Sequence, residues 1–517
     1  TAWIGIGAFI GLLLAACGML VPAWRDTRSR SVAAARVTFA HPSSPLWQRL
    51  FLDVALLLVA ALVFWLIAGT GYQVVVAPEG VPQTAVHYDA FLAPLCLWIG
   101  AALLVMRLTR LTLSRGRRLL TRMLVPFAGP LSPVVAASLS RQRDLIARGA
   151  VLVVLAFAFA TSTSVFDTTY KAQSLVDAQL TNGADVTVTG TTSVPAGALL
   201  PRLAALPGVE AAQLMMHRYA YVGHDLQDIY GINPRTISTA TPMSNAYFAG
   251  GGARAMLERL AARPNGVLVS EETVRNFQLR FGDRLNLKLQ SAADHKYHVV
   301  PFRYLGVVRE FPTAPRDSFL VANAAYIAKT TGTNASEVVL LRTSANPAGV
   351  AAAARRVVGA TPGIKVTTLD EAHRIIGSSL TAVDLRGLTG LELGFAVLMI
   401  VGATGLVLAL GLAERRRSFA ILIALGARAS QLGAFIWSEV SLIVGIGAVF
   451  GIAIGFGVAE VLVKVLSGVF DPPPQGLSIP WIYLVVVVAA AIICTVASVG
   501  FTLSLARKPD PWALRRS

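Results

Sequence analysis

Seven apolar segments, each of about 20 residues or more, are the feature that most constrains the fold of this chain. A helix needs about 20 predominantly apolar residues to cross a bilayer, so each segment predicts a membrane-spanning helix. Only 14% of the 517 residues are charged, against about 25% in soluble domains. The chain is therefore predicted to be an α-helical polytopic membrane protein. Its predicted spans are 1–22, 50–69, 90–111, 149–166, 388–413, 432–463 and 481–505.

The basic residues alternate with these spans and predict the topology. Four segments, 23–50, 107–148, 414–428 and 506–517, carry 22 Lys and Arg against four Asp and Glu. Cytoplasmic loops of membrane proteins carry the excess of basic residues, so we expect these four segments in the cytoplasm. The first residue is then outside and the carboxy terminus inside. This placement accounts for the formal net charge of +17, so nucleic acid is not expected as a partner.

Residues 167–387 have the composition of a soluble domain and are predicted to form one extracytoplasmic α+β domain. Segments 168–180 and 370–387 continue as helices toward the neighbouring spans. They are either helical stalks that carry the domain or ordinary juxtamembrane helices, and the residues favour neither. Period-2 alternation and turn signals predict strands at 185–189, 267–270, 284–289, 304–308 and 365–368. Helical patterns occupy 196–205, 253–262, 271–280 and 347–358.

The first and last spans are similar, since Trp3-Ile4 opens one, Trp481-Ile482 opens the other, and a basic segment follows each. This similarity indicates two modules. We expect residues 1–36 to be the last transmembrane helix of a truncated first module and 37–131 a linker helix pair. The second module would then comprise three parts: an elbow helix and first span at 132–166, the extracytoplasmic domain at 167–387, and a three-helix domain at 388–517.

Three sets of residues are candidates for function. In 414–428, Phe419, Leu422, Ile423 and Gly426 follow helical spacing between arginines. From the residues alone this pattern slightly favours an interfacial helix over a helix that docks on a soluble partner. The docking residues would be Glu414, Arg415, Arg416, Arg417, Phe419, Leu422, Leu425, Gly426, Ala427 and Arg428.

The second set lies in the elbow helix predicted over 132–148. Its apolar residues Val134, Val135, Leu139 and Leu145 are expected to face lipid. Arg141, Arg143 and Arg148 would face headgroups or a soluble partner, with lipid phosphates preferred. The third set is Gly447, Gly451 and Gly455, four residues apart in the sixth span. Small residues at this spacing predict close helix packing, with a gating hinge as the alternative.

Catalytic motifs are absent from the sequence. There is no G-x-x-x-x-G-K-[ST] phosphate loop, no H-E-x-x-H and no G-x-S-x-G. His217, His224 and His373 have no evident partners, and His295 and His298 are spaced unlike ligands on one strand face. We therefore expect no catalytic residue, no bound metal and no cofactor on this chain.

Over 132–517 the chain resembles the permease of FtsX/MacB-type ABC transporters. The most specific part is 414–428, Glu-Arg-Arg-Arg-Ser-Phe-Ala-Ile-Leu-Ile-Ala-Leu-Gly-Ala-Arg, which is similar to the cytoplasmic element of that family. Ser418 departs from the pattern, because an acidic residue is frequent there. The other similar pieces are 183–186, 206–209, 281–285, 304–308 and 435–439.

The resemblance implies four spans per module, an external domain between the first two, and cytoplasmic ABC ATPase subunits that carry the ATP and Mg. It implies a non-catalytic subunit of a bacterial plasma membrane that couples ATP hydrolysis to movement of the external domain. An amphipathic substrate (a lipid, lipoprotein, peptide or drug) would be exported or extracted. The alternative is a regulatory membrane protein that signals to an extracytoplasmic hydrolase. Membrane lipids and an extracytoplasmic lipoprotein or enzyme are the further partners implied.

Overall fold

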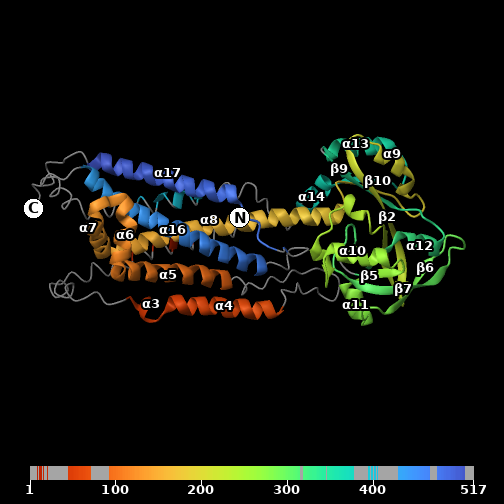
Figure 1. Ribbon diagram of the computed structural model, residues 1–517, viewed down its shortest axis with the longest axis horizontal. Helices are drawn as coiled ribbons and strands as arrows, with labels where there is room; N and C mark the ends of the chain where they lie inside the picture. The colour runs from red at the N-terminus through yellow and green to blue at the C-terminus, as the bar shows by residue number, and fades with distance from the viewer. Residues whose placement is uncertain are drawn as a thin grey trace, which may run out of the picture.

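The structure is a computed structural model that describes residues 45–70, 92–314, 318–344, 346–377, 429–465, 474 and 476–506. Scattered residues between 9 and 20 and between 394 and 405 are also described. Figure 1 shows the two parts of the molecule, a bundle of helices at one end and a sheet domain at the other. One long helix, α8 (Arg143–Asn182), runs through the bundle and into the sheet domain.

The bundle consists of long apolar helices and three shorter ones. By length and composition, α5, α8 and the Gly433–Val465 part of α16 are long and apolar enough to cross a membrane. The apolar stretches of α4 and α17 are shorter, at Leu52–Ile67 and Trp481–Ala497. Most of the predicted spans 1–22 and 388–413 lies outside the described residues. The bundle helices are α3 (Leu46–Arg49), α4 (Leu52–Thr70), α5 (Leu92–Arg115), α6 (Arg117–Ala128), α7 (Ser132–Arg141), α8, α16 (Ala429–Val465) and α17 (Trp481–Ala506).

Helix α6 was not expected from the sequence. Its Leu120 and Leu124, four residues apart, are buried against α7 and α5. Val135 and Leu139 of α7 belong to the same buried cluster. The expectation that these two residues face lipid was therefore wrong. They pack on α6, which covers the apolar side of α7. Figure 1 places α6 and α7 at the end of the bundle away from the sheet domain.

The sheet domain contains a ten-stranded sheet that partly closes on itself. The strand order is β10-β1-β9-β2-β3-β8-β5-β7-β4, where β4 is the short strand Phe248–Ala249, and β6 pairs with both β2 and β7. The path β2-β3-β8-β5-β7-β6 therefore returns to β2 and forms a ring. Its strands are β2 (Val209–Val222), β3 (Asp225–Ile232), β5 (Gly266–Ser270), β6 (Arg284–Gln290), β7 (Tyr297–Val308) and β8 (Phe319–Asn323).

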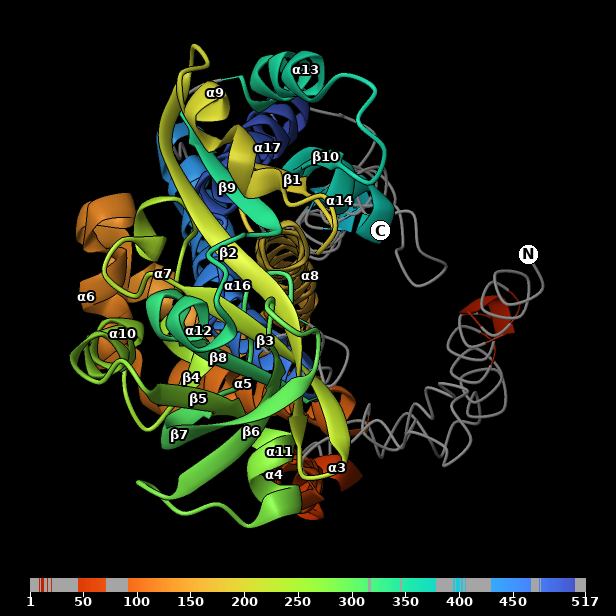
Figure 2. The same cartoon turned by 90° about the vertical axis from the view of Figure 1, so that its right-hand side faces the viewer.

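Strand β2 joins this ring to a second, smaller lobe (Figure 2). Residues 209–215 of β2 pair with β9 (Val338–Thr343), whereas residues 215–222 pair with β3. The smaller lobe also holds β1 (Val186–Thr189) and β10 (Lys365–Thr368), covered by α9 (Leu200–Ala204) and α13 (Pro347–Val358). The predicted α+β fold class is thus observed, with one strand shared by two lobes.

Several predicted elements coincide with the observed ones. The helices at 253–262 (α10) and 347–358 (α13) and the strand at 365–368 have the expected bounds. The helix predicted over 271–280 ends at Phe277 (α11), because Gln278 adopts a left-handed conformation with φ of 51°. The pattern missed β2, β3, β4, β8, β9 and α12 (Ala324–Thr331), whose residues lack clean alternation or long periodicity.

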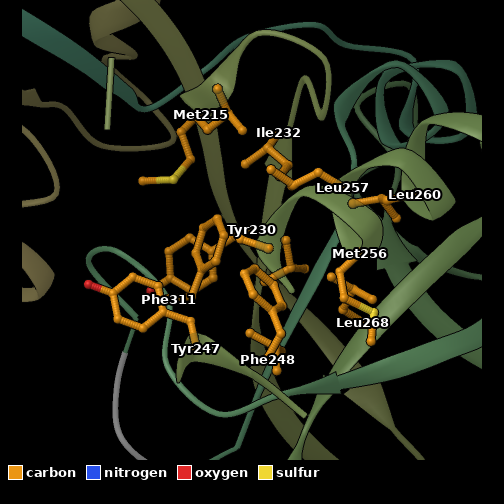
Figure 3. Close-up of a cluster of buried hydrophobic side chains, with 14 of the residues drawn as sticks. Met215, Tyr230, Ile232, Tyr247, Phe248, Met256, Leu257, Leu260, Leu268 and Phe311 are labelled. Atoms are coloured by element: carbon orange, nitrogen blue, oxygen red, sulfur yellow. The ribbon is translucent and has the colours of Figure 1, made fainter. Parts of the chain in front are cut away.

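The core of the sheet domain is rich in aromatic side chains (Figure 3). Tyr230, Tyr247 and Phe311 are buried together with Met256 and Leu260 of α10. Tyr230 lies 5.9 Å from Phe311, ring centre to ring centre. Because burial disfavours a charged phenolate, it raises the pKa of Tyr247 to about 12, with the Glu310 carboxylate as a smaller cause.

Alkaline pH is therefore expected to weaken the sheet domain through Tyr247. In the unfolded chain this tyrosine ionises near pH 10, so stability is fully present below pH 10 and is lost as the pH rises toward 12. The loss attributable to Tyr247 is roughly 2 kcal/mol. Tyr247→Phe removes the ionisable group, so its free energy of unfolding should fall less between pH 9 and pH 12. Equal pH profiles for both proteins, measured by circular dichroism, would contradict this assignment.

Candidate functional site

Helix α8 is the element that connects the helix bundle to the sheet domain. It holds 40 residues, which corresponds to a length of about 60 Å at 1.5 Å per residue. The hydrocarbon core of a bilayer is only about 30 Å thick. The helix contains no proline, and it ends at Gly183, whose φ of 83° is accessible mainly to glycine. A single rigid element therefore includes both the predicted span 149–166 and the segment 168–180.

The three glycines of α16 lie directly against α8. A Cβ atom at Gly447 would lie 2.3 Å from Cγ1 of Val153. At Gly451 it would lie 2.5 Å from Cβ of Phe157, and at Gly455 2.5 Å from Cβ of Thr161. Each approach is closer than a side chain allows, so the two backbones touch along three turns of helix. The structure thus gives this glycine row a defined neighbour, which the spacing alone did not name.

The predicted elbow over 132–148 is not one helix. Helix α7 ends at Arg141, Gln142 interrupts it, and α8 begins at Arg143. Arg143 and Arg148 therefore belong to the first two turns of α8, and only Arg141 lies on the elbow. All three side chains are exposed. The continuous apolar face assumed for this segment was wrong because α7 turns to pack on α6.

One ion pair joins the two linker helices to each other, and a second joins α5 to α8. Nη2 of Arg107 on α5 lies 2.7 Å from Oδ1 of Asp53 on α4, and the Asp53 side chain is fully buried. Arg107 also donates a hydrogen bond of 3.0 Å to the carbonyl of Gln48. Nε of Arg110 lies 2.9 Å from Oδ1 of Asp144 in the first turn of α8. Asp53 was not among the residues predicted from the sequence. An acidic residue inside an apolar helix indicates a buried partner of opposite charge.

At its other end, α8 is bonded to the sheet domain. The backbone N–H of Thr313 donates to the carbonyl of Leu180 at 2.7 Å. The hydroxyl of Tyr230 donates to the carbonyl of Thr313 at 3.0 Å. The Thr187 hydroxyl of β1 donates to the carbonyl of Asn182, the last residue of α8. These bonds fix the last turn of α8 to both lobes of the sheet domain.

His217 extends the network around Tyr230. Its ring stacks on the Tyr230 ring at 4.8 Å, and its Nε2 lies 2.5 Å from Oδ1 of Asp228. The expectation that His217 lacks partners was therefore wrong. The cause is strand register: His217 lies directly opposite Tyr230 in the β2–β3 pair, which places Asp228 two residues away along β3.

The chain leaves the sheet domain beside the point where it enters. Strand β10 pairs with β1, and the N–H of Leu369 donates to the carbonyl of Asp185 at 3.0 Å. Helix α14 (Leu369–Gly377) follows and packs against α8 (Figure 1). The N–H of Ser478, ahead of α17, donates to Oγ1 of Thr169 on α8 at 3.0 Å. The helix that leaves the domain, α14, and the segment ahead of α17 therefore both contact α8.

The segment 414–428, which carries the predicted docking helix, lies outside the described residues. Glu439, which the sequence places near the start of the sixth span, is buried in α16. Within the part of the chain that the structure describes, no group of three His, Cys, Asp or Glu side chains is arranged to hold a metal ion.

Three comparisons place these features among known proteins. Residues 391–511 match the model of a family described as FtsX-like permease C-terminal. No curated protein matches the chain. Among solved structures, the extracellular domain of the noncanonic ABC-type transporter YknZ from Gram-positive bacteria is similar at 12% sequence identity, with a TM-score of 0.24. That match covers 35% of this chain and 99% of the other.

Proposed function

We propose that the chain is a permease of the FtsX type and the membrane subunit of an ABC transporter; the match of residues 391–511 to the FtsX-like permease C-terminal model supports this. In this proposal a separate cytoplasmic ATPase binds and hydrolyses ATP with Mg, and this chain performs no chemistry itself. The membrane is the bacterial plasma membrane, with the carboxy terminus in the cytoplasm. Movement of the sheet domain then exports or extracts an amphipathic substrate.

The continuity of α8 is the observation that carries this mechanism. One helix of 40 residues starts at the basic end of the bundle and ends in hydrogen bonds to the sheet domain. A helix without a proline or an internal break moves as a rigid rod. A displacement of α8 at Arg143 would therefore also displace Leu180 and the Thr313 backbone bonded to it, instead of being absorbed by bending within the helix. In this proposal α16, in backbone contact with α8, moves together with it.

The proposed input is the segment 414–428, which leads into α16. Its arginines and its apolar face at Phe419, Leu422 and Leu425 would dock in a groove of the ATPase. Because α16 begins at Ala429, force applied to this segment would reach α16 directly.

ATP hydrolysis by the partner ATPase, with both proteins reconstituted in vesicles, tests this proposal. The full-length permease should change the ATPase rate several-fold. Leu425→Asp, and a triple change of Arg415, Arg416 and Arg417 to Glu, should abolish that change, since each replaces a docking contact with a buried or repelling charge.

The matched control reverses three exposed arginines of the sheet domain, Arg202, Arg235 and Arg263. It alters the net charge by the same amount far from the bundle end, so it should leave coupling intact. Normal coupling by the 415–417 variant would remove the docking site from the proposal. A permease that regulates no ATPase at all would contradict the transporter function.

A further inference from the structure

An open hollow lies on the surface at the turn between α5 and α6, and no part of the proposed function uses it. Its volume is about 700 Å³, and it is lined by Arg115, Gly116, Arg117, Arg118, Leu119 and Thr121. Gly116 makes the turn possible, because a Cβ there would lie 2.5 Å from the carbonyl oxygen of Thr112. The turn brings Arg115, the last residue of α5, together with the first two residues of α6.

The positive charge of the arginines that line the hollow favours an anionic ligand. Three arginines, Arg115, Arg117 and Arg118, line it, and no ion pair with a carboxylate is found for them among the described residues. Asp144 is the one acidic residue of segment 107–148, against nine arginines, and it is paired with Arg110. Arginine forks match the oxygens of a phosphate group in pairs. A phosphodiester is therefore the complementary ligand.

The surroundings of the hollow are apolar and exposed, which points to a lipid rather than a soluble anion. On α5, Leu108 and Leu111 are 38% and 43% exposed. They precede Arg115 by seven and four residues, so all three lie on one face of the helix. That face forms an apolar track that leads up to the arginines.

Helix α6 continues the same pattern beyond the turn. Leu119 and Met123, four residues apart, are 55% and 59% exposed, whereas Leu120 and Leu124 face the bundle and are buried. Exposed apolar residues next to arginines are typical of a helix that lies in the headgroup layer of a membrane. A carboxylate-rich protein surface would match the arginines but leave this apolar surface in water.

We propose that the α5–α6 hollow binds the phosphate of an anionic phospholipid whose acyl chains lie along Leu108 and Leu111 of α5. The arginines neutralise the phosphate, and α6 rests in the headgroup layer beside it. The bound lipid would anchor the end of the bundle at which α8 begins (Figure 1). This proposal rests on α5 crossing the membrane, as the proposed function assumes.

Lipid binding by the purified full-length chain tests the proposal. The chain in detergent is titrated with dioctanoyl phosphatidylglycerol and, separately, with dioctanoyl phosphatidylcholine, and bound lipid is counted by native mass spectrometry. The wild type should prefer phosphatidylglycerol. A triple change of Arg115, Arg117 and Arg118 to Gln should lower the affinity for phosphatidylglycerol by tenfold or more, because each basic residue contributes about 1 kcal/mol to binding an anionic surface.

Two further variants separate local effects from general ones. Arg202, Arg235 and Arg263 changed to Gln remove the same charge from the sheet domain and should retain wild-type affinity. Leu108→Ser combined with Leu111→Ser should weaken lipid binding with all arginines present, since it replaces the apolar track. Unchanged affinity in the arginine variant, or equal affinity of the wild type for both lipids, would overturn the proposal.

Competition and coupling distinguish the other ligands. Inorganic phosphate at the lipid concentration should not displace phosphatidylglycerol; displacement would identify a free-anion site and overturn the proposal. The Arg115, Arg117 and Arg118 variant is also assayed for ATPase regulation. Loss of regulation with lipid affinity unchanged would assign the hollow to the ATPase instead. Failure of the lipid assay with normal coupling would overturn this inference and leave the proposed function intact.

Discussion

Gly451→Leu is expected to disrupt the packing of α16 on α8 and to leave little folded protein. Even a Cβ at this position would lie 2.7 Å from the carbonyl oxygen of Val154 and 2.5 Å from Cβ of Phe157. The first obstacle is backbone, which has no rotamer through which to move aside. Inserting side-chain atoms into a packed contact costs about 1–3 kcal/mol, and more where the backbone must shift. We expect the free energy of unfolding to fall by about 3 kcal/mol. The thermal unfolding midpoint of the chain in detergent should fall with it.

The same helix provides the control. Gly445 lies six residues earlier, on the exposed side of α16, and a Cβ there would meet no atom within 4 Å. Gly445→Leu should therefore be neutral or slightly stabilising, because leucine has a higher helix propensity than glycine by almost 1 kcal/mol. Equal unfolding midpoints for Gly445→Leu and Gly451→Leu would show that α8 and α16 do not touch along the glycine row.

Loss of the Asp53 carboxylate is expected to produce the second large effect. The Asp53 side chain is fully buried and pairs with Arg107, whose side chain is 19% exposed. Asp53→Ala leaves the guanidinium of Arg107 without its carboxylate in a low-dielectric site. Removal of one partner from a buried pair costs about 3–5 kcal/mol, and we expect the unfolding midpoint to fall accordingly.

Two variants show whether the charge itself is the cause. Asp53→Leu combined with Arg107→Leu removes both charges and should recover most of the loss, since an apolar pair often replaces a buried ion pair without cost. Asp144→Ala removes a carboxylate that is 55% exposed and pairs with Arg110; it should cost less than about 1 kcal/mol. If the double leucine variant is no more stable than Asp53→Ala, packing rather than charge holds α4 to α5.

Much of the local structure was predictable because local patterns carry it. The helix at 253–262 shows its buried stripe in Met256, Leu257 and Leu260, spaced as a helix requires. Strand 284–290 alternates buried and exposed residues without a break. Strand β2 was not predicted because it runs through both lobes and pairs with β9 in one and with β6 in the other. Its pattern of buried and exposed residues therefore follows no single period.

The candidate site was predictable only in part. The spacing of Gly447, Gly451 and Gly455 predicted a close helix contact but gave no information about the helix that fills it. The arginines of 132–148 were expected on one elbow helix, whereas the break at Gln142 leaves Arg141 on α7 and places Arg143 and Arg148 on α8. His217 found its partners through strand register with β3, which no local pattern of β2 contains.

By itself, the sequence determined which segments are apolar enough to span a membrane, where basic residues gather, and which residues share a face of a helix or strand. These properties depend on composition and period, which are local. Only the tertiary structure decided that Asp53 meets Arg107, 54 residues away, and that the strand ring closes through β6. It also decided that the first half of α8 packs against α16 and that its last turn is hydrogen-bonded to Thr313. A period identifies the face that must be covered, whereas the covering segment is chosen by shape and charge between distant parts of the chain.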